Sequence, residues 1–256
     1  MYKRIKLQIF EMKNIILILA IYFTNIEFSK AQLVDIDENV YITKRIGVQN
    51  LRYATSRDGN GNVEVYSDSF LIWTTSNLNV SKFKTGETII EAKTSAEWED
   101  ALNRGIPAWC YVNNDPSTGK TLGKLYNYYA VTSLKGLAPK GWHIASDFEW
   151  EMVYKYYKFQ ITEANSYEDY KYFMNSSWKS PHKWGNGTNK TGFNALPSGY
   201  RSISGFTNDG AYYWGDINLD RKNGAFHTIL GDIYICDSGC EWTYTLGFSV
   251  RCVKDW

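Results

Sequence analysis

The sequence predicts an α+β fold in which two short helices pack against strands. The first observation is a pair of capping boxes, Thr94-Ser-Ala-Glu97 and Ser146-Asp-Phe-Glu149. In each box the hydroxyl accepts an otherwise unpaired backbone N–H, and the glutamate reaches back to the N–H of the capping residue. The second observation is the pattern around the boxes, where short alternating or continuous apolar runs are separated by turns rich in Gly, Pro and Asn.

The first half of the chain is expected to form strands, a hairpin and one helix. Residues 34–47 combine an acidic turn with β-branched and aromatic alternation, which predicts an extended segment. The turn Asp58-Gly-Asn-Gly-Asn62 lies between the alternating runs 51–56 and 63–66 and predicts a β-hairpin. After the first capping box, apolar residues recur at helical spacing until Gly105, which is expected to end the helix.

The second half begins with an expected buried strand at 107–112. Pro139 and Gly141 predict a turn, because proline fixes its own φ and glycine accepts conformations that other residues resist. The turn leads into an extended segment, 142–144, and then into the helix that the second capping box begins. Residues 161–190 are polar and aromatic without clean periodicity, which predicts a long loop.

The last residues, 247–255, alternate in hydrophobicity and predict a closing strand. Alternate side chains of a strand point to opposite faces, so Phe248, Val250 and Cys252 are expected to face one way. Four large apolar residues upstream are expected in the core of the sheet: Phe193, Leu196, Tyr200 and Trp214.

The N-terminus predicts export. Nine consecutive apolar residues, 15–23, follow Lys13, and a polar stretch then ends in Ser29-Lys30-Ala31. A basic start, a short apolar run and small residues before the cleavage point define a secretory signal peptide, here 1–31 with cleavage before Gln32. The run is too short to span a bilayer, which takes about 20 residues. A secreted or cell-surface protein with no membrane span after cleavage is expected.

The mature chain, 32–256, is expected to be a single domain, with 50–71 as an inserted hairpin. Its charge is close to neutral, with 23 basic and 25 acidic residues after the signal peptide is removed. A near-neutral chain without a basic run argues against nucleic acid as a partner.

Four cysteines form an even set in a chain expected to be exported, which favours disulfides. The sequence does not choose among the possible pairings; we favour Cys110–Cys252 and Cys236–Cys240. Cys236 and Cys240 could also supply two zinc ligands, but no histidine lies near them. We therefore predict no metal site.

Several long stretches resemble one family. They include Gly123-Lys-Leu-Tyr-Asn-Tyr-Tyr-Ala-Val131, Gly141-Trp-His-Ile144, the run 188–201 and Gly247-Phe-Ser-Val-Arg-Cys252. Together with the opening Asp35-x-Asp-x-Asn-x-Tyr41, they resemble the Fibrobacter succinogenes major paralogous domain family of small secreted domains. The resemblance implies a C-type-lectin-like fold with twisted antiparallel sheets, two main short helices, long loops, and first and last strands that are neighbours.

The chain departs from the family pattern at three single positions. Ala138 stands where the family usually has cysteine, so the resemblance implies that a family disulfide is absent or rerouted to Cys236 or Cys240. Ala145 replaces a usual proline and Ser198 a usual glycine, which changes local backbone freedom and leaves the expected fold unchanged.

The sequence predicts no catalytic residue and no cofactor. The three histidines lie far apart, and neither a nucleophile elbow nor a phosphate-binding glycine loop is present. His143 is interpreted as a buried imidazole whose hydrogen bonds are satisfied. The acidic opening turn lacks the glycine and terminal glutamate of an EF-hand loop, which favours a solvated turn over a calcium site. An alternative is a redox enzyme similar to the formylglycine-generating enzymes, with Cys236 and Cys240 as its cysteine pair.

Recognition is the favoured function, as an adhesion module at a bacterial surface that binds a carbohydrate or a surface protein. Aromatic and amide side chains suit sugar faces and hydroxyls, or a protein interface. The candidate ligand-binding residues are Trp178, His182, Trp184, Asn186, Asn189, Tyr212 and Tyr213. Two other interpretations stay open: these aromatics could pin the long loop to the core, and the domain could be a structural module of the cell envelope.

Overall fold

The structure is a computed structural model of the chain. It describes residues 32–47, 53–57, 63–66, 70–146, 149–150, 181–182, 185–186, 192–208, 210–218, 223–229 and 243–255. The chain divides into two units, Met1–Gln32 and Leu33–Trp256, and of the first only Gln32 is described. The predicted signal peptide lies outside the described residues.

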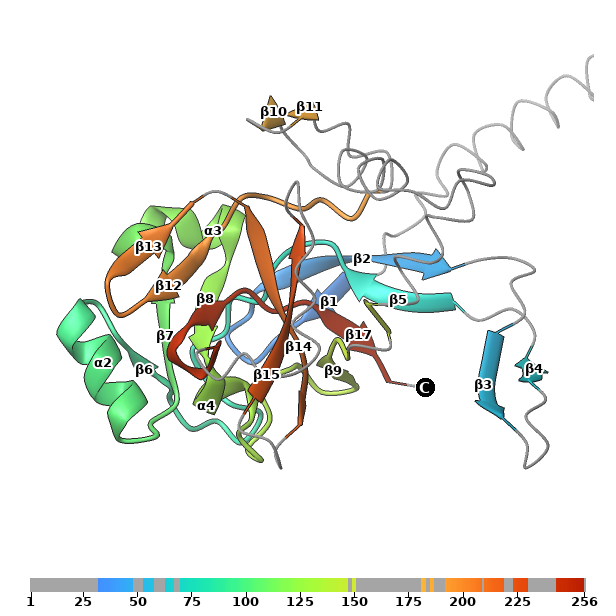
Figure 1. Cartoon of the computed structure of the whole chain (residues 1–256), viewed down its shortest axis with the longest axis horizontal. Coiled ribbons are helices and arrows are strands. Elements are labelled where there is room, and N and C mark those ends of the chain that lie inside the picture. Colours follow the sequence, from blue (N-terminus) through green and yellow to red (C-terminus); the bar gives the residue numbers. More distant parts are fainter. Residues whose placement is uncertain are drawn as a thin grey trace, which may run out of the picture. The chain divides into compact units, whose positions relative to one another are not determined.

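Most described strands belong to two sheets (Figure 1). The five-stranded sheet has the order β1-β2-β5-β17-β9 and the six-stranded sheet the order β13-β12-β16-β8-β7-β6. The first consists of β1 (Gln32–Val34), β2 (Val40–Gly47), β5 (Phe70–Thr74), β17 (Cys252–Lys254) and β9 (Trp142–Ile144). The second consists of β13 (Gly205–Thr207), β12 (Tyr200–Ser202), β16 (Gly247–Phe248), β8 (Lys124–Asn127), β7 (Ala108–Tyr111) and β6 (Ile90–Glu91).

Three further antiparallel pairs complete the described strands. They are β3 (Tyr53–Arg57) with β4 (Val63–Tyr66), β10 (Pro181–His182) with β11 (Gly185–Asn186), and β14 (Ala211–Asn218) with β15 (Asn223–Ile229). The β3–β4 pairing is the hairpin predicted from the glycine-rich turn at 58–62. The pairings recorded between neighbouring strands of the two sheets are antiparallel except β6–β7, so the fold is mixed α+β with mostly antiparallel sheets.

Short helices connect the strands. The α-helices are α2 (Ser95–Asn103), α3 (Gly119–Leu122) and α4 (Tyr128–Val131), and the 3-10 turns are η1 (Val112–Asn114), η2 (Pro116–Thr118) and η3 (Thr243–Thr245). The capping box predicted for α2 is confirmed: Thr94 Oγ1 accepts from Glu97 N at 3.1 Å, and Glu97 Oε2 accepts from Thr94 N at 3.0 Å. Gly105 follows the helix with a φ of +66°.

The second capping box is also confirmed. Glu149 N donates to Ser146 Oγ at 3.3 Å, while Glu149 Oε2 accepts from Ser146 N at 2.8 Å. Trp150 N donates to the Ser146 carbonyl at 3.0 Å, as at the start of a helix. The rest of the predicted helix, and nearly all of the predicted loop 161–190, lies outside the described residues.

The core has two parts on opposite sides of the six-stranded sheet. The larger joins the two sheets, with Tyr41 from one and Trp109 and Phe248 from the other. The smaller lies under α2, where Trp98, Ala101 and Leu102 pack on Ala108, Cys110 and Leu125. Successive residues of β7 thus enter different parts of the core, as the alternation of a strand requires.

The closing segment, 247–255, is predicted to form one strand, but the structure shows two. Phe248, Val250 and Cys252 do share one part of the core. The segment nevertheless divides into β16 and β17, which belong to different sheets, so it joins the two sheets. The expectation that the first and last strands are neighbours is wrong, because β2 and β5 lie between β1 and β17.

The predicted Cys110–Cys252 disulfide is wrong. Both thiols are free and buried. Cys110 packs under α2 and Cys252 lies in the core shared by the two sheets, so the six-stranded sheet separates them. Burial raises the pKa of each thiol to about 12. Cys236 and Cys240 lie outside the described residues.

Candidate functional site

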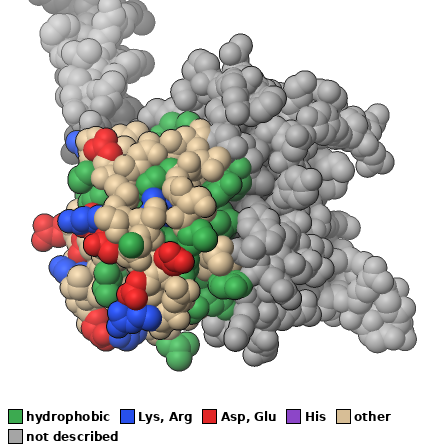
Figure 2. Space-filling view, turned by 60° about the vertical axis from the view of Figure 1, so that its left-hand side comes forward, with side chains coloured by type: hydrophobic (Ala, Val, Ile, Leu, Met, Phe, Trp, Pro, Cys, Tyr) green, Lys and Arg blue, Asp and Glu red, His purple; other side chains and the backbone are tan. Residues whose placement is uncertain are grey.

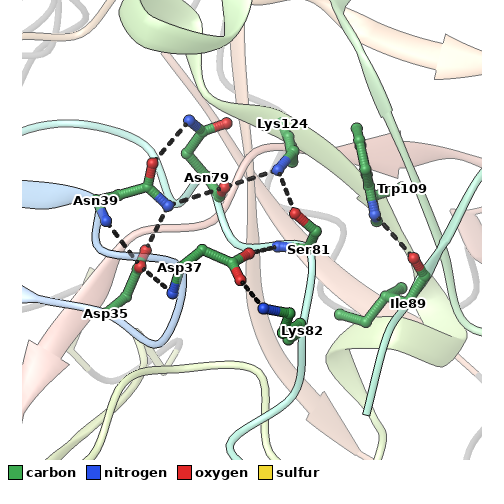
Figure 3. Close-up of polar contacts among 9 residues, drawn as sticks. All are labelled: Asp35, Asp37, Asn39, Asn79, Ser81, Lys82, Ile89, Trp109 and Lys124. Carbon is green, nitrogen blue, oxygen red and sulfur yellow. Dashed lines mark hydrogen bonds and ion pairs between the residues drawn. The ribbon is translucent and has the colours of Figure 1, made fainter. Parts of the chain in front are cut away.

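The acidic opening turn is held by a network of hydrogen bonds (Figure 3). Asp35 Oδ1 accepts from the backbone N of Asp37 at 2.8 Å and of Asn39 at 3.0 Å. Asp35 Oδ2 accepts from Asn39 Nδ2 at 2.8 Å and from the Tyr41 hydroxyl. All four donors belong to the protein, so the Asp35 carboxylate closes the turn on itself. The predicted turn is confirmed, although Asp35 is buried and not solvated.

A second acidic residue ties this turn to residues 79–82. Asp37 accepts a hydrogen bond from Ser81 N through Oδ2, and its Oδ1 lies 3.3 Å from Lys82 Nζ. Partial burial raises the pKa of Asp37, but the hydrogen bonds from Ser81 and Lys82 outweigh burial and lower the pKa overall. Asn39 adds a bond from its Nδ2 to the Asn79 carbonyl at 3.2 Å.

Lys124 completes the network from β8. Its Nζ donates to the Asn79 carbonyl at 2.8 Å and to Ser81 Oγ at 3.1 Å, and lies 4.1 Å from the centroid of the Trp109 ring (Figure 3). Two oxygens and one aromatic face match the three donors of an ammonium group. Burial lowers the pKa of Lys124 to about 8, although the nearby charges of Asp37, Asp35 and Glu91 favour the charged form. We call these residues (Asp35, Asp37, Asn39, Asn79, Ser81 and Lys124) the opening-turn network.

His143 lies between two carboxylates. Its Nε2 is 2.8 Å from Glu149 Oε1 and its Nδ1 is 2.8 Å from Asp255 Oδ1. The hydrogen bond to Glu149 raises the pKa of His143 to about 9 against the opposing effect of burial, and Asp255 adds to the rise. The prediction of satisfied ring nitrogens is confirmed, but the side chain is 38% exposed and therefore not buried.

Arg251 carries a fully buried charge between the sheets. Its Nε donates to Asn77 Oδ1 at 2.8 Å, and its terminal nitrogens donate to three backbone carbonyls, those of Thr74, Phe193 and Asn194. The guanidinium also lies 4.7 Å from the centroid of the Phe193 ring. Arg251 therefore fixes residues 193–194 to the end of β5 through hydrogen bonds that are buried or partly buried.

The structure does not bring the predicted ligand-binding residues together on one surface. Tyr212 and Tyr213 are buried, which corrects the expectation that they are exposed. Tyr212 stacks on Phe248 with centroids 5.9 Å apart, and Tyr213 packs on Trp150 at 5.2 Å, because strand β14 lies over the core. The backbones of His182 and Asn186 lie on the paired strands β10 and β11. Trp178, Trp184 and Asn189 are outside the described residues.

The described residues contain no group of three or more His, Cys, Asp or Glu side chains that could hold a metal ion. Within the same residues, no helix has the length and hydropathy needed to cross a membrane.

Comparison with known families identifies the chain's relatives. The profile of the Fibrobacter succinogenes major domain matches residues 70–254. The chain belongs to this family. No curated protein and no protein of solved structure matches the chain. The matched part of the Fibrobacter major domain begins at β5, so β1, β2 and the β3–β4 hairpin precede it.

Sequence reasoning missed Lys124, Asn79 and Ser81. Lys124 lies in the stretch Gly123–Val131 that carries the resemblance to the Fibrobacter major domain, and it is a lone charge at the start of an apolar strand. A lysine in that position signals a buried ammonium with acceptors nearby. Its acceptors come from residues 79–81, more than forty positions earlier, and no local pattern points to them.

Proposed function

We propose that this member of the Fibrobacter major domain family is an exported, non-catalytic recognition or adhesion module at a bacterial surface. Its fold is C-type-lectin-like, and its ligand is a carbohydrate or a surface protein. The signal-peptide pattern at 1–31 supports export, and two mostly antiparallel sheets with few short helices support the lectin-like fold.

One observation carries the proposal: several charged groups of the described scaffold are fully engaged by other groups of the protein. Asp35, His143 and Arg251 each have their hydrogen-bonding atoms directed at protein partners. Groups used in this way hold strands and turns in place and are not available to reacting atoms. A rigid scaffold of this kind supports recognition by the loops that it carries.

The loop segment 178–189 is the candidate recognition region. It contains Trp178, Trp184 and several amides, and β10 and β11 pair within it. Tryptophan and amide side chains suit contact with the apolar faces and hydroxyls of a sugar, or with the centre of a protein interface.

The test is a glycan array and a surface-protein capture assay with the purified protein, followed by titration of any ligand found. We expect Trp178→Ala and Trp184→Ala to weaken binding by about tenfold or more. Tyr244→Ala, which removes a 40% exposed aromatic side chain elsewhere, is the matched control and should bind normally. Binding that survives both tryptophan changes, or the absence of any ligand, would refute this role for the loop.

A structural role in the cell envelope is a second candidate function, and one observation favours it. Strand β1 is the edge of the five-stranded sheet, and aliphatic side chains on β1 and β2 are exposed: Val34 by 56%, Val40 by 56% and Ile42 by 45%. Among the described residues no strand pairs with the outer side of β1, and an edge strand beside apolar side chains favours pairing with another chain. Light scattering of the wild-type protein and of Val40→Lys decides this: assembly that Val40→Lys abolishes supports it, and a monomer at high concentration rejects it.

A further inference from the structure

Arg201 is a buried cation without a counter-ion in the described part of the chain. It lies at the centre of β12, paired with Phe206 on one side and Gly247 on the other, and is only 2% exposed. Its guanidinium carbon lies 4.4 Å from the centroid of the Phe206 ring. The Nε atom is buried without a hydrogen-bond partner, and burial lowers the pKa of the group. A buried guanidinium normally has a carboxylate or a bound ion beside it, because an unpaired buried charge is costly.

The guanidinium is directed at the N-terminus of α2. Its terminal nitrogen donates to Ser95 Oγ at 3.2 Å, and Ser95 is the first residue of that nine-residue helix. The capping box engages the N–H groups of Thr94 and Glu97, but the N–H groups of Ser95 and Ala96 meet no acceptor among the described residues. The Glu97 carboxylate, which accepts from the N–H groups of Lys93 and Thr94, offsets part of the positive charge at this helix end. The N–H groups of Ser95 and Ala96 and the Nε of Arg201 remain donors without an acceptor among the described residues.

We propose that Arg201, the Ser95 hydroxyl and the N–H groups of Ser95 and Ala96 form a binding site for an oxyanion, a carboxylate or sulfate group carried by a small ligand. Such a group accepts from a planar guanidinium and from backbone N–H groups at once. Ser95 and Ala96 are exposed while Arg201 is buried, so the anion approaches from the Ser95 side and replaces the Ser95 hydroxyl as the acceptor of the Arg201 terminal nitrogen.

The surface around the proposed site does not attract an anion through an excess of positive charge. Figure 2 brings forward the side of the molecule on which α2 lies in Figure 1, and acidic and basic side chains are interspersed across it. Attraction at this face therefore depends on the local donors and not on a broad positive field. The proposed site contains none of residues 178–189, so it can fail while the proposed recognition role holds, and the reverse.

The test is an NMR titration that follows the amide signals of Ser95 and Ala96 at constant ionic strength. Sulfate and glucuronate are the two probes, and glucose is the neutral counterpart of glucuronate. We expect saturable shifts with one or both anions and none with glucose. The anion that binds more tightly identifies the source of the oxyanion.

Three variants distinguish anion binding at the proposed site from the general effect of a negative charge near the start of a helix. Arg201→Met should weaken anion binding by about tenfold or more. Ser95→Asp keeps Arg201 and supplies a carboxylate within the chain, so it should raise Tm and abolish anion binding, even if Arg201→Met does not fold. Ala96→Asp places the same charge in the same helical turn without the observed contact to Arg201, and should raise Tm less than Ser95→Asp.

Three results would overturn the proposal. One is an absence of saturable shifts with either anion. Another is anion binding that persists unchanged in Ser95→Asp. The last is equal stabilisation by Ser95→Asp and Ala96→Asp, which would show that the helix dipole alone accounts for the effect.

Discussion

His143 Nε2 and Glu149 Oε1 lie 2.8 Å apart, joining strand β9 to the first turn of the helix that Ser146 caps. The other ring nitrogen bonds to Asp255, close to the end of the described chain. One imidazole thus connects three segments. Because both ring nitrogens face carboxylates, the protonated ring donates to both, and its charge state affects how firmly these segments are joined.

The contact predicts a loss of stability in mild alkali. The pKa of His143 is raised to about 9 in the folded protein from 6.5, so its contribution is complete below 6.5 and is lost as the pH rises through 9. Since more than a third of the side chain is exposed, solvent screening limits the contribution to about 1 kcal/mol. Urea unfolding at several pH values should show the advantage of wild type over His143→Gln shrinking across this range. A constant difference would contradict the prediction.

For Lys124 we expect the opposite dependence on pH, with stability that rises as the pH rises. Its pKa is lowered to about 8 in the folded protein from 10.5, so between these values the unfolded chain holds a proton that the folded protein has released. Stability from this group therefore rises with pH in that range. The stability of wild type minus that of Lys124→Met, measured by urea unfolding, should increase over this interval. The control is Lys120→Met, which changes an exposed lysine on α3 and should give a difference that does not vary with pH.

Breaking the buried Arg251 network should be far more costly than breaking an exposed ion pair. Arg251→Leu leaves Asn77 Oδ1, two buried carbonyls and one partly buried carbonyl without their donor, and we expect a loss of about 3–5 kcal/mol in the free energy of unfolding. Arg104→Leu removes an exposed pair with Asp100 and should cost less than about 0.5 kcal/mol. Similar losses in thermal or urea unfolding for both variants would contradict the structural role of Arg251.

Cys110 and Cys252 should be free thiols that do not react with alkylating reagents in the folded protein. Burial raises the pKa of Cys110 and Cys252 to about 12, and the thiolate is the reactive form. Mass spectrometry should find both residues unalkylated by iodoacetamide in the native protein and fully alkylated after denaturation without reductant. Resistance to alkylation in the denatured state would show that one of them is in a disulfide.

The sequence by itself determined the local elements of this protein. Both capping boxes, the turn at Pro139–Gly141, the hairpin 53–66 and the strand at 142–144 follow from residues within a few positions of one another. The family was likewise recognised from continuous stretches. Local hydrogen bonding, backbone freedom and side-chain period are properties of neighbouring residues, so a pattern in the sequence is sufficient to reveal them.

The tertiary structure decided everything that depends on residues far apart in the chain. It placed Cys110 and Cys252 on opposite sides of a sheet, divided the closing segment between two sheets and buried Tyr212 and Tyr213. It also brought Lys124 to residues 79–81 and Arg201 to Ser95. Alternation in a strand shows that two faces exist but not what covers each face, because burial is set by the packing of distant elements, and with it the partner of every buried charge.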